Sequence, residues 1–177
     1  MRELRRAGRL ALVLVLALPL AGARNPAESA APLGPGPQEV GVVGVFSDAH
    51  GQHGVLLEGK RDKRRVLMVI GTAEATAIAL PLDHITPPRP LTHDLFLTLF
   101  GRLKVSVSKV VITDLRNNTY YATLYLTVDG APMELDSRPS DAIALAIRAN
   151  APVFAEERVF EKSELLPGNP AEPGERI

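Results

Sequence analysis

Alternation of apolar and polar residues is clearest in the middle of the chain, where it predicts three consecutive strands. From Thr119 to Val128 one side of the strand is apolar, while tyrosines and threonines occupy the other side. The preceding segment, Val105 to Leu115, also alternates but shifts its apolar phase half-way, which indicates a β-bulge. Asn117-Asn118 and Asp129-Gly130 suit tight hairpin turns. The pattern therefore predicts an antiparallel meander that ends with Met133 to Leu135.

Shorter apolar segments predict further strands on both sides of this meander. Val40 to Phe46 and Val55 to Leu57 flank a polar, glycine-containing turn, as in a hairpin. Val66 to Ile70 contains only apolar residues, which predicts a central strand covered on both faces. Pro152 to Ala155 adds a final short strand.

Other apolar segments have the spacing and the start signals of helices. Thr72 can cap an alanine-rich helix that runs to Leu80, and Glu156 to Lys162 fits a short helix or turn. A second helix is expected from Thr92, its candidate cap, after a proline-rich connector. Its apolar stripe would pack on the core and consists of Leu95, Phe96, Leu99 and Leu103.

The third helix has the strongest start signal. Ser137 can cap its first backbone N–H groups, and Pro139 fits the first turn because a missing N–H costs nothing there. Ala142 to Ile147 contains no polar side chain, so most of the helix circumference should be buried. The fold class predicted is α+β, an antiparallel-rich sheet with about three helices packed on one face.

The two ends of the chain differ in composition from this domain. Four arginines, the apolar run Leu10 to Leu20 and the small residues Ala21 to Ala23 together predict a secretory signal. The alternative is an uncleaved anchor, but the run is shorter than the roughly 20 residues of a spanning helix. The expected organisation is a signal peptide at 1–23, a flexible Pro/Ala-rich linker at 24–37, the folded domain at 38–166 and a disordered tail at 167–177.

Export would place the domain in the periplasm or outside the cell, with no stable membrane span after cleavage. The 177 residues contain 20 basic and 20 acidic side chains. Removing residues 1–23 takes four arginines and one glutamate, which leaves 16 basic and 19 acidic residues and a net charge of −3. The mature chain is therefore not a generally basic nucleic-acid-binding protein. Because it has no cysteine, disulfides, thiolate nucleophiles and cysteine-based zinc sites are excluded.

A local basic patch could still contact phosphates. Five cations lie in the predicted hairpin tip, namely Lys60, Arg61, Lys63, Arg64 and Arg65. A solvated tip is the simpler interpretation of such a charge run. The functional alternative is a surface that binds the phosphates of a nucleic acid.

Carboxylates gather at the predicted helix starts. Asp136 to Asp141 places two carboxylates, two hydroxyls and an arginine before a buried helix, where capping alone would explain them but an anion could also bind. Hydrolysis of phosphodiesters commonly uses clustered carboxylates that hold divalent cations. If the helix starts converge, the candidates are Glu74, Asp94, Asp114, Asp136 and Asp141 as carboxylates, Arg138 for phosphate and His93 for proton transfer.

Three motifs in this order resemble the bifunctional nuclease family of bacteria and plants. They are Gly71-Thr72-Ala73-Glu74-Ala75, Pro90-Leu91-Thr92-His93-Asp94-Leu95 and the stretch Asp136 to Arg148, which contains Arg138-Pro139-Ser140-Asp141-Ala142. The similarity covers roughly Val40 to Phe160. The resemblance implies degradation of RNA and DNA, assisted by magnesium or manganese. It implies a site made of His93, Asp94, Asp136, Arg138, Ser140 and Asp141, with Glu74, Asp94 and Asp141 as metal ligands. In the functional interpretation of the basic cluster, Lys60, Arg61, Arg64 and Arg65 would bind the substrate.

Two other functions stay open at this point. A non-catalytic binding or assembly module would use the polar helix starts as caps and salt bridges. A secreted hydrolase of another phosphate ester would keep the carboxylates around a closed pocket. We also expect a homo-oligomer, with the Tyr/Thr side of the strand Thr119 to Val128 as a candidate interface. A metal-dependent nuclease requires several carboxylates within about 4–6 Å of one cation position.

Overall fold

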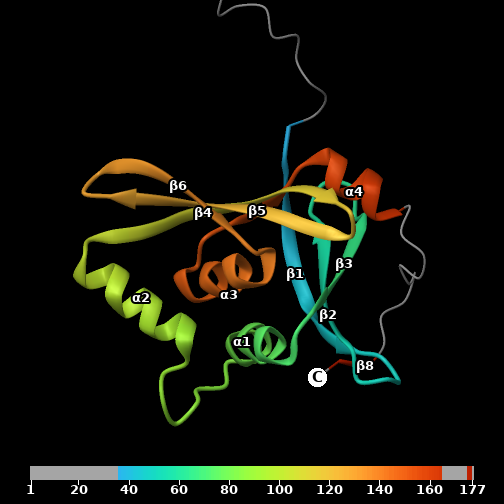
Figure 1. The fold of residues 1–177 in the computed structure, drawn as a ribbon, viewed down its shortest axis with the longest axis horizontal. Coiled ribbons are helices and arrows are strands. Elements are labelled where there is room, and N and C mark those ends of the chain that lie inside the picture. The colour runs from blue at the N-terminus through green and yellow to red at the C-terminus, as the bar shows by residue number, and fades with distance from the viewer. Residues whose placement is uncertain (1–35, 165–174, 177) are drawn as a thin grey trace, which may run out of the picture. The chain divides into compact units, whose positions relative to one another are not determined.

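The computed structural model describes residues 36–164 and 175–176 (Figure 1). The strands are β1 (Gln38–Ser47), β2 (His53–Gly59), β3 (Arg65–Ile70), β4 (Val105–Arg116), β5 (Thr119–Val128), β6 (Ala131–Ser137), β7 (Val153–Ala155) and β8 (Glu175–Arg176). The helices are α1 (Thr72–Leu82), α2 (Thr92–Arg102), α3 (Pro139–Ala149) and α4 (Glu157–Glu164). The predicted signal peptide lies outside the described residues, as do the linker up to residue 35 and residues 165–174.

The strands form one curled sheet in the order β3-β2-β1-β7-β4-β5-β6, with β8 paired to β1. All neighbours are antiparallel except β4 and β7, which run parallel. Glu175 and Arg176, in the predicted disordered tail, belong to β8 and pair with β1. The α+β prediction with a mostly antiparallel sheet is therefore confirmed.

The predicted meander is confirmed in detail. The register between β4 and β5 shifts between Val107 and Lys109, where the bulge was expected, and shifts again between Ile112 and Asp114. Asn117 and Asn118 both have positive φ angles, 48° and 57°, as a tight hairpin turn requires. Local sequence thus determines where this part of the chain turns.

The expectation that Val66 to Ile70 forms a central strand is wrong. β3 lies at one end of the sheet, and only one of its faces is covered. Val66 and Met68 are buried, whereas 62% of Val69 is exposed. An apolar run has no periodicity that could distinguish a central strand from an edge strand.

Within residues 36–164, four helices rather than three pack on the sheet. In Figure 1, α1, α2 and α3 lie together below β4 and β5, while α4 lies on the other side of these strands. α4 contacts both β4 and β3, which are separated by three strands in the sheet order, and this is possible because the sheet curls. The segment that was expected as a short helix or turn therefore forms a fourth helix outside the main helical layer.

α3 is the buried helix that the sequence predicts. Its residues Ala142 to Ala146 are all buried against α1, β4 and β5. Pro139 occupies the first turn, and Asn150 ends the helix in a left-handed conformation with φ of 52°. Within the described residues, no helix is both long enough and apolar enough to cross a membrane.

The predicted packing of α2 is wrong. None of its residues is buried, and the stripe assigned to the core is about half exposed. The helix instead rests on the core through Leu97 and Phe100, at one border of a wider apolar arc. Periodicity located the arc correctly, but it could not tell which part of the arc meets the core.

The predicted caps are each wrong by one residue. Gly71, Leu91 and Arg138 occupy the N-cap positions, and no side chain caps these helices from there. Ser137 instead donates its hydroxyl to the backbone oxygen of Arg138. Arg138 has the extended backbone that a residue before proline prefers, so α3 begins one residue later than a serine cap would place it.

Candidate functional site

The starts of α1, α2 and α3 bring four polar side chains together, which we call the helix-start cluster: Glu74, His93, Arg138 and Asp141. Arg138 joins two of them, because its Nε donates to Asp141 Oδ2 at 2.6 Å and its Nη2 lies 2.9 Å from Glu74 Oε1. His93 Nε2 lies 3.3 Å from the other oxygen of Asp141. Asp141 therefore stands between an arginine and a histidine.

Exposure differs strongly within this cluster. The Arg138 side chain is 66% exposed, whereas those of Glu74 and His93 are 18% and 13% exposed. A guanidinium has five N–H donors, and the two contacts to carboxylates leave Nη1 for other acceptors. The cluster thus presents an anchored but accessible cation.

Local sequence explains how the cluster is held. Asp141 follows Arg138 by three residues, so the two side chains meet on one side of the first turn of α3. Glu74 reaches back toward the start of α1, where a side chain at Gly71 would collide with its carboxylate. Gly71 has an ordinary φ of −75°, so it provides space rather than an unusual backbone conformation.

The charges of the cluster reinforce each other. The hydrogen bond to Asp141, followed by the attraction of this carboxylate, raises the pKa of Arg138 above its already high ordinary value. The first turn of α3 also favours negative charge through the helix dipole, which supports Asp141. Arg138 is therefore a permanent cation within a group that contains two carboxylates.

Two cavities flank Arg138. One of about 380 Å³ is lined by Glu74, Thr92, His93, Arg138 and Asp141, among others. The other, of about 240 Å³, lies between β3, the β4–β5 turn and the start of α3, and Ser140 lines it together with Glu74 and Arg138. An anion in either cavity can reach the guanidinium. The sequence interpretation missed Thr92 as a lining residue because it assigned that side chain to capping.

Asp94 is not part of the helix-start cluster. It accepts hydrogen bonds from the backbone N–H of Leu91 and, at 2.7 Å, from Arg148 Nε. Burial tends to raise the pKa of Asp94, but hydrogen bonds from Arg148 and Leu91 outweigh it and lower the pKa below its ordinary value. Asp94 thus joins α2 to α3.

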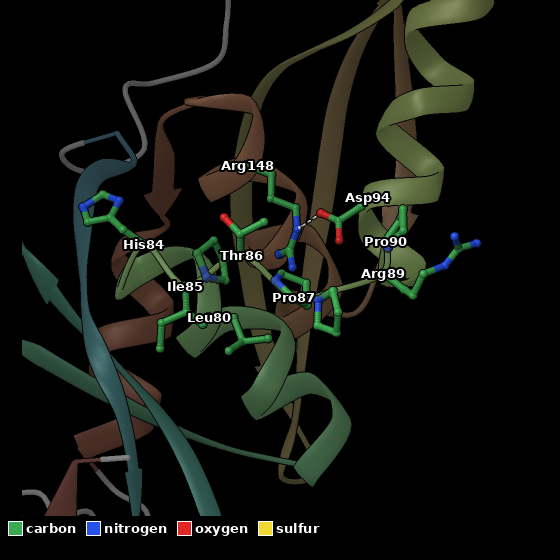
Figure 2. A pocket seen from close by; sticks show the side chains of 11 residues that line it. Leu80, His84, Ile85, Thr86, Pro87, Arg89, Pro90, Asp94 and Arg148 are labelled. Atoms are coloured by element: carbon green, nitrogen blue, oxygen red, sulfur yellow. Dashed lines mark hydrogen bonds and ion pairs between the residues drawn. The ribbon is translucent and has the colours of Figure 1, made fainter.

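The Asp94–Arg148 pair borders a separate cavity of about 480 Å³, whose other walls come mainly from the proline-rich loop between α1 and α2. Figure 2 shows this pair on one side of the cavity, with His84 and Arg89 farther out. Arg148 also donates to the backbone oxygens of Ala77 and Ala144. Its side chain is only 9% exposed, so this cavity lacks a free cation there.

Asp136 also lies apart from the cluster. It pairs with Thr123 in the sheet and therefore shares the Tyr/Thr face of β5, opposite to the face on which α3 packs. The side-chain period of a strand is two, so Asp136 and Ser137 necessarily point to opposite faces. Closeness in sequence to Arg138 did not bring Asp136 to the same site.

The predicted basic patch, the basic turn from Lys60 to Arg65, is ion-paired. Its pairs are Lys60 with Glu39, Arg61 with Glu157, Lys63 and Arg65 with Glu58, and Arg64 with Asp62 and Glu157. Arg64 lowers the pKa of Asp62 to about 2 and also covers the ring of Phe160. The turn precedes β3 whereas Gly71 follows it, and six residues of strand span about 20 Å. The structure does not bring these cations to the helix-start cluster.

Asp114, the remaining carboxylate candidate, is buried and fully engaged. Lys162 Nζ and Arg116 Nε donate to it at 2.5 and 2.6 Å, and the backbone N–H of Leu115 donates at 2.8 Å. Hydrogen bonds from Lys162 and Arg116 hold its pKa well below the ordinary range. This carboxylate holds α4 on β4.

The cluster does not offer a ready site for a divalent cation. In the described part of the chain, no group of three His, Cys, Asp or Glu side chains has the arrangement that could hold a metal ion. The guanidinium of Arg138 occupies the position between Glu74 and Asp141 that a cation would need. As arranged, the donor set suits an anion at Arg138 better than a metal.

Comparison with known proteins identifies the family. A model of the bifunctional nuclease domain matches residues 55–167, which include the whole helix-start cluster. An uncharacterized protein of Mycobacterium tuberculosis is 40% identical over 129 residues, which are 72% of this chain and 77% of that protein. Bifunctional nuclease 1 of Oryza sativa subsp. japonica and the bifunctional nuclease of Oryza minuta are each 32% identical over 117 residues, 63% of this chain but 35% of those proteins. The chain therefore belongs to the bifunctional nuclease domain family.

Proposed function

We propose that this chain is an exported nuclease that hydrolyses phosphodiester bonds of RNA, DNA or both. The observation that carries the proposal is Arg138, which is two-thirds exposed yet held between two carboxylates beside a histidine. Family membership supports the choice of substrate, because relatives in rice are named bifunctional nucleases. Export rests on the signal-like residues 1–23.

The roles follow from the atoms that remain free. The Nη1 donors of Arg138 would bind a non-bridging phosphate oxygen and favour the extra negative charge of the transition state. His93 would take a proton from the attacking water and return a proton to the leaving oxygen as the P–O bond breaks. Asp141 would orient the imidazole and the guanidinium at once, because each of its oxygens faces one of them.

A magnesium or manganese ion is a separate proposal. It would require Arg138 to leave the position between Glu74 and Asp141, since the described residues offer no other three-ligand group. We therefore derive no step through a metal. Hydrolysis assays with magnesium, manganese or EDTA test this point directly.

The decisive assay uses labelled single-stranded DNA and RNA with the purified chain and an Asp141→Asn variant. A matched control is Asp136→Asn. Asp136 is an exposed carboxylate on the face of the sheet opposite to α3. We expect cleavage that Asp141→Asn abolishes and Asp136→Asn retains. Absence of cleavage by the folded chain under every metal condition, or equal loss in both variants, would contradict the proposal.

The neutralisation of Arg138 favours one alternative, a non-catalytic binding or assembly module. In that case the guanidinium and the two carboxylates only join the starts of α1 and α3. The same samples distinguish the two functions: a binding module would retain labelled nucleic acid, or ignore it, without shortening it.

A further inference from the structure

The proposed mechanism uses only one of the two cavities that flank Arg138. His93, the proton-transfer group, and Asp141, which orients it, line the cavity of about 380 Å³. Neither of them lines the cavity of about 240 Å³ between β3, the β4–β5 turn and the start of α3, which we call the β3–α3 cavity. A group that enters the β3–α3 cavity would therefore be bound there without being cleaved there.

The start of α3 leaves backbone donors without partners beside the β3–α3 cavity. The first hydrogen bond of the helix runs from the N–H of Ala142 to the backbone oxygen of Arg138 at 3.1 Å. No acceptor in the described residues binds the N–H groups of Ser140 and Asp141, and no side chain caps the helix. Free N–H groups and the helix dipole together attract an anion, and a phosphate fits this arrangement well.

The side chain of Ser140 is a second, independent sign of a ligand in this cavity. Only 7% of Ser140 is exposed, and its hydroxyl has no hydrogen-bond partner among the described residues. Most buried hydroxyls are hydrogen-bonded, because losing water without gaining a partner costs free energy. Ser140 lines the β3–α3 cavity, so a ligand there can supply the partner that the described chain does not.

Arg138 adds a full positive charge and lines both cavities. Its Nη1 atom carries two N–H groups that contact neither carboxylate, so one guanidinium can donate to a phosphate on each side. Glu74 also lines both cavities, but its carboxylate lies 2.9 Å from Nη2 of Arg138, which offsets its charge. The β3–α3 cavity thus combines a shared cation, a hydroxyl and an uncapped helix start.

The remaining walls of the cavity suit a nucleotide more than a free inorganic anion. Val69 and Ile70 of β3 form an apolar wall, and 62% of Val69 is exposed. Asn118 and Thr119 of the β4–β5 turn supply polar groups to the same cavity. Apolar walls offer contacts to the sugar or base attached to a phosphate, which inorganic phosphate lacks. The expected ligand is therefore a phosphate that belongs to a nucleotide chain.

We propose that the β3–α3 cavity binds the phosphate next to the scissile phosphate on the same nucleic-acid strand. The inference rests on the proposed function, because that function places the scissile phosphate beside His93. Consecutive phosphates are one nucleotide apart, so a strand that passes Arg138 can place one phosphate in each cavity. The preferred substrate is then a strand with at least two consecutive phosphates, and a dinucleoside monophosphate would leave the β3–α3 cavity empty.

Amide NMR titrations of the purified chain test this subsite by binding, in a His93→Gln background that keeps the ligands intact. The probes are the dinucleoside monophosphate of thymidine and its forms with an added 5′- or 3′-phosphate. We expect at least one phosphorylated form to bind about tenfold more tightly, with shifts of the Ser140 and Asp141 amide signals. Ser140→Asp should remove this gain, because its carboxylate would repel the added phosphate, and Ser140→Ala should reduce the gain about threefold.

Ser106→Asp is the matched control, since it adds the same charge near the end of β4 opposite to the β4–β5 turn and should keep the gain. Three results would each overturn the proposal: equal affinity for all three dinucleotides, a gain that survives both Ser140 variants, or inorganic phosphate that shifts the same signals with equal affinity. Amide signals that stay unchanged elsewhere confirm that the variants are folded. A wild-type chain that cleaves no nucleic acid but shows the gain would retain the subsite while the proposed function failed.

Discussion

Two carboxylates of this domain, Asp114 and Asp141, each bind an arginine, but their surroundings differ. Asp114 is 5% exposed and receives three donors, so its oxygens are almost closed to another molecule. Asp141 is about one-third exposed and supports two groups that face cavities. An ion-paired carboxylate therefore only stabilises the fold when it is buried together with its hydrogen-bond donors. It can take part in catalysis when the side chains it binds face a cavity and keep N–H donors for another molecule.

The largest predicted difference between the surroundings of Asp141 and those of Asp114 is the effect of a substitution on nuclease activity. Replacing His93 by Gln removes the proton-transfer group while keeping a side chain of similar size, so we expect cleavage to fall by about 10²- to 10⁴-fold. The midpoint of thermal unfolding should change little. His84→Gln, at the border of the other cavity, is the control that should keep full activity. A similar loss of cleavage in His93→Gln and His84→Gln would contradict the special role of the helix-start cluster.

Arg148→Met tests whether a buried pair outside the cluster acts only on stability. The change leaves Asp94 and two backbone oxygens without their donor, so the free energy of unfolding should fall by about 2–3 kcal/mol. Urea denaturation measures this difference. Arg158→Met, at an exposed arginine, should cost less than about 0.5 kcal/mol. A stable Arg148→Met protein would contradict the structural role of the pair.

Asp114→Asn should reduce the free energy of unfolding by about 1–3 kcal/mol near neutral pH. The reduction is limited because the cations of Arg116 and Lys162 are partly exposed to water. The pKa of Asp114 is lower in the folded chain than in the unfolded chain. Its stabilisation is therefore complete above the ordinary pKa of an aspartate, about 4, and is lost as the pH falls below that value toward the folded pKa. Denaturation curves of both proteins between pH 7 and 2 should converge at the acidic end.

The smallest effect is expected at the basic turn. Lys60→Gln and Arg61→Gln each remove an exposed ion pair, which contributes about 0–1 kcal/mol. If these cations only balance nearby carboxylates, nuclease activity should change less than about threefold and its salt dependence should stay the same. If nuclease activity depended less on salt concentration in either variant, the turn would bind phosphates, which is the functional interpretation of the basic cluster in the sequence.

Much of the fold was predictable because its signals are local. Asparagine pairs that tolerate positive φ fixed the meander turn, and the phase slip near Lys109 located the bulge. Pro139, the first residue of α3, fixed the start of this helix to within one residue. Helix and strand positions depend on neighbours in sequence, so one sequence contains most of that information.

The site was predictable only in part. In the structure His93, Arg138 and Asp141 lie together, but Asp94 binds Arg148 and Asp136 points to the opposite face of β6. Asp94 directly follows His93, and Asp136 lies two residues before Arg138. The rotation between successive helical residues separates the first pair, and the end of β6 before Arg138 separates the second. Which neighbour enters the site depends on register and packing.

The sequence by itself determined the family, the meander and the buried third helix, because these follow from motifs and periodicities that act over a few residues. Only the tertiary structure decided which carboxylates meet, that β3 lies at an edge and that the apolar arc of α2 faces outward. Those outcomes depend on contacts between segments far apart in the chain. Their free energy is shared among many residues, so no short pattern specifies them.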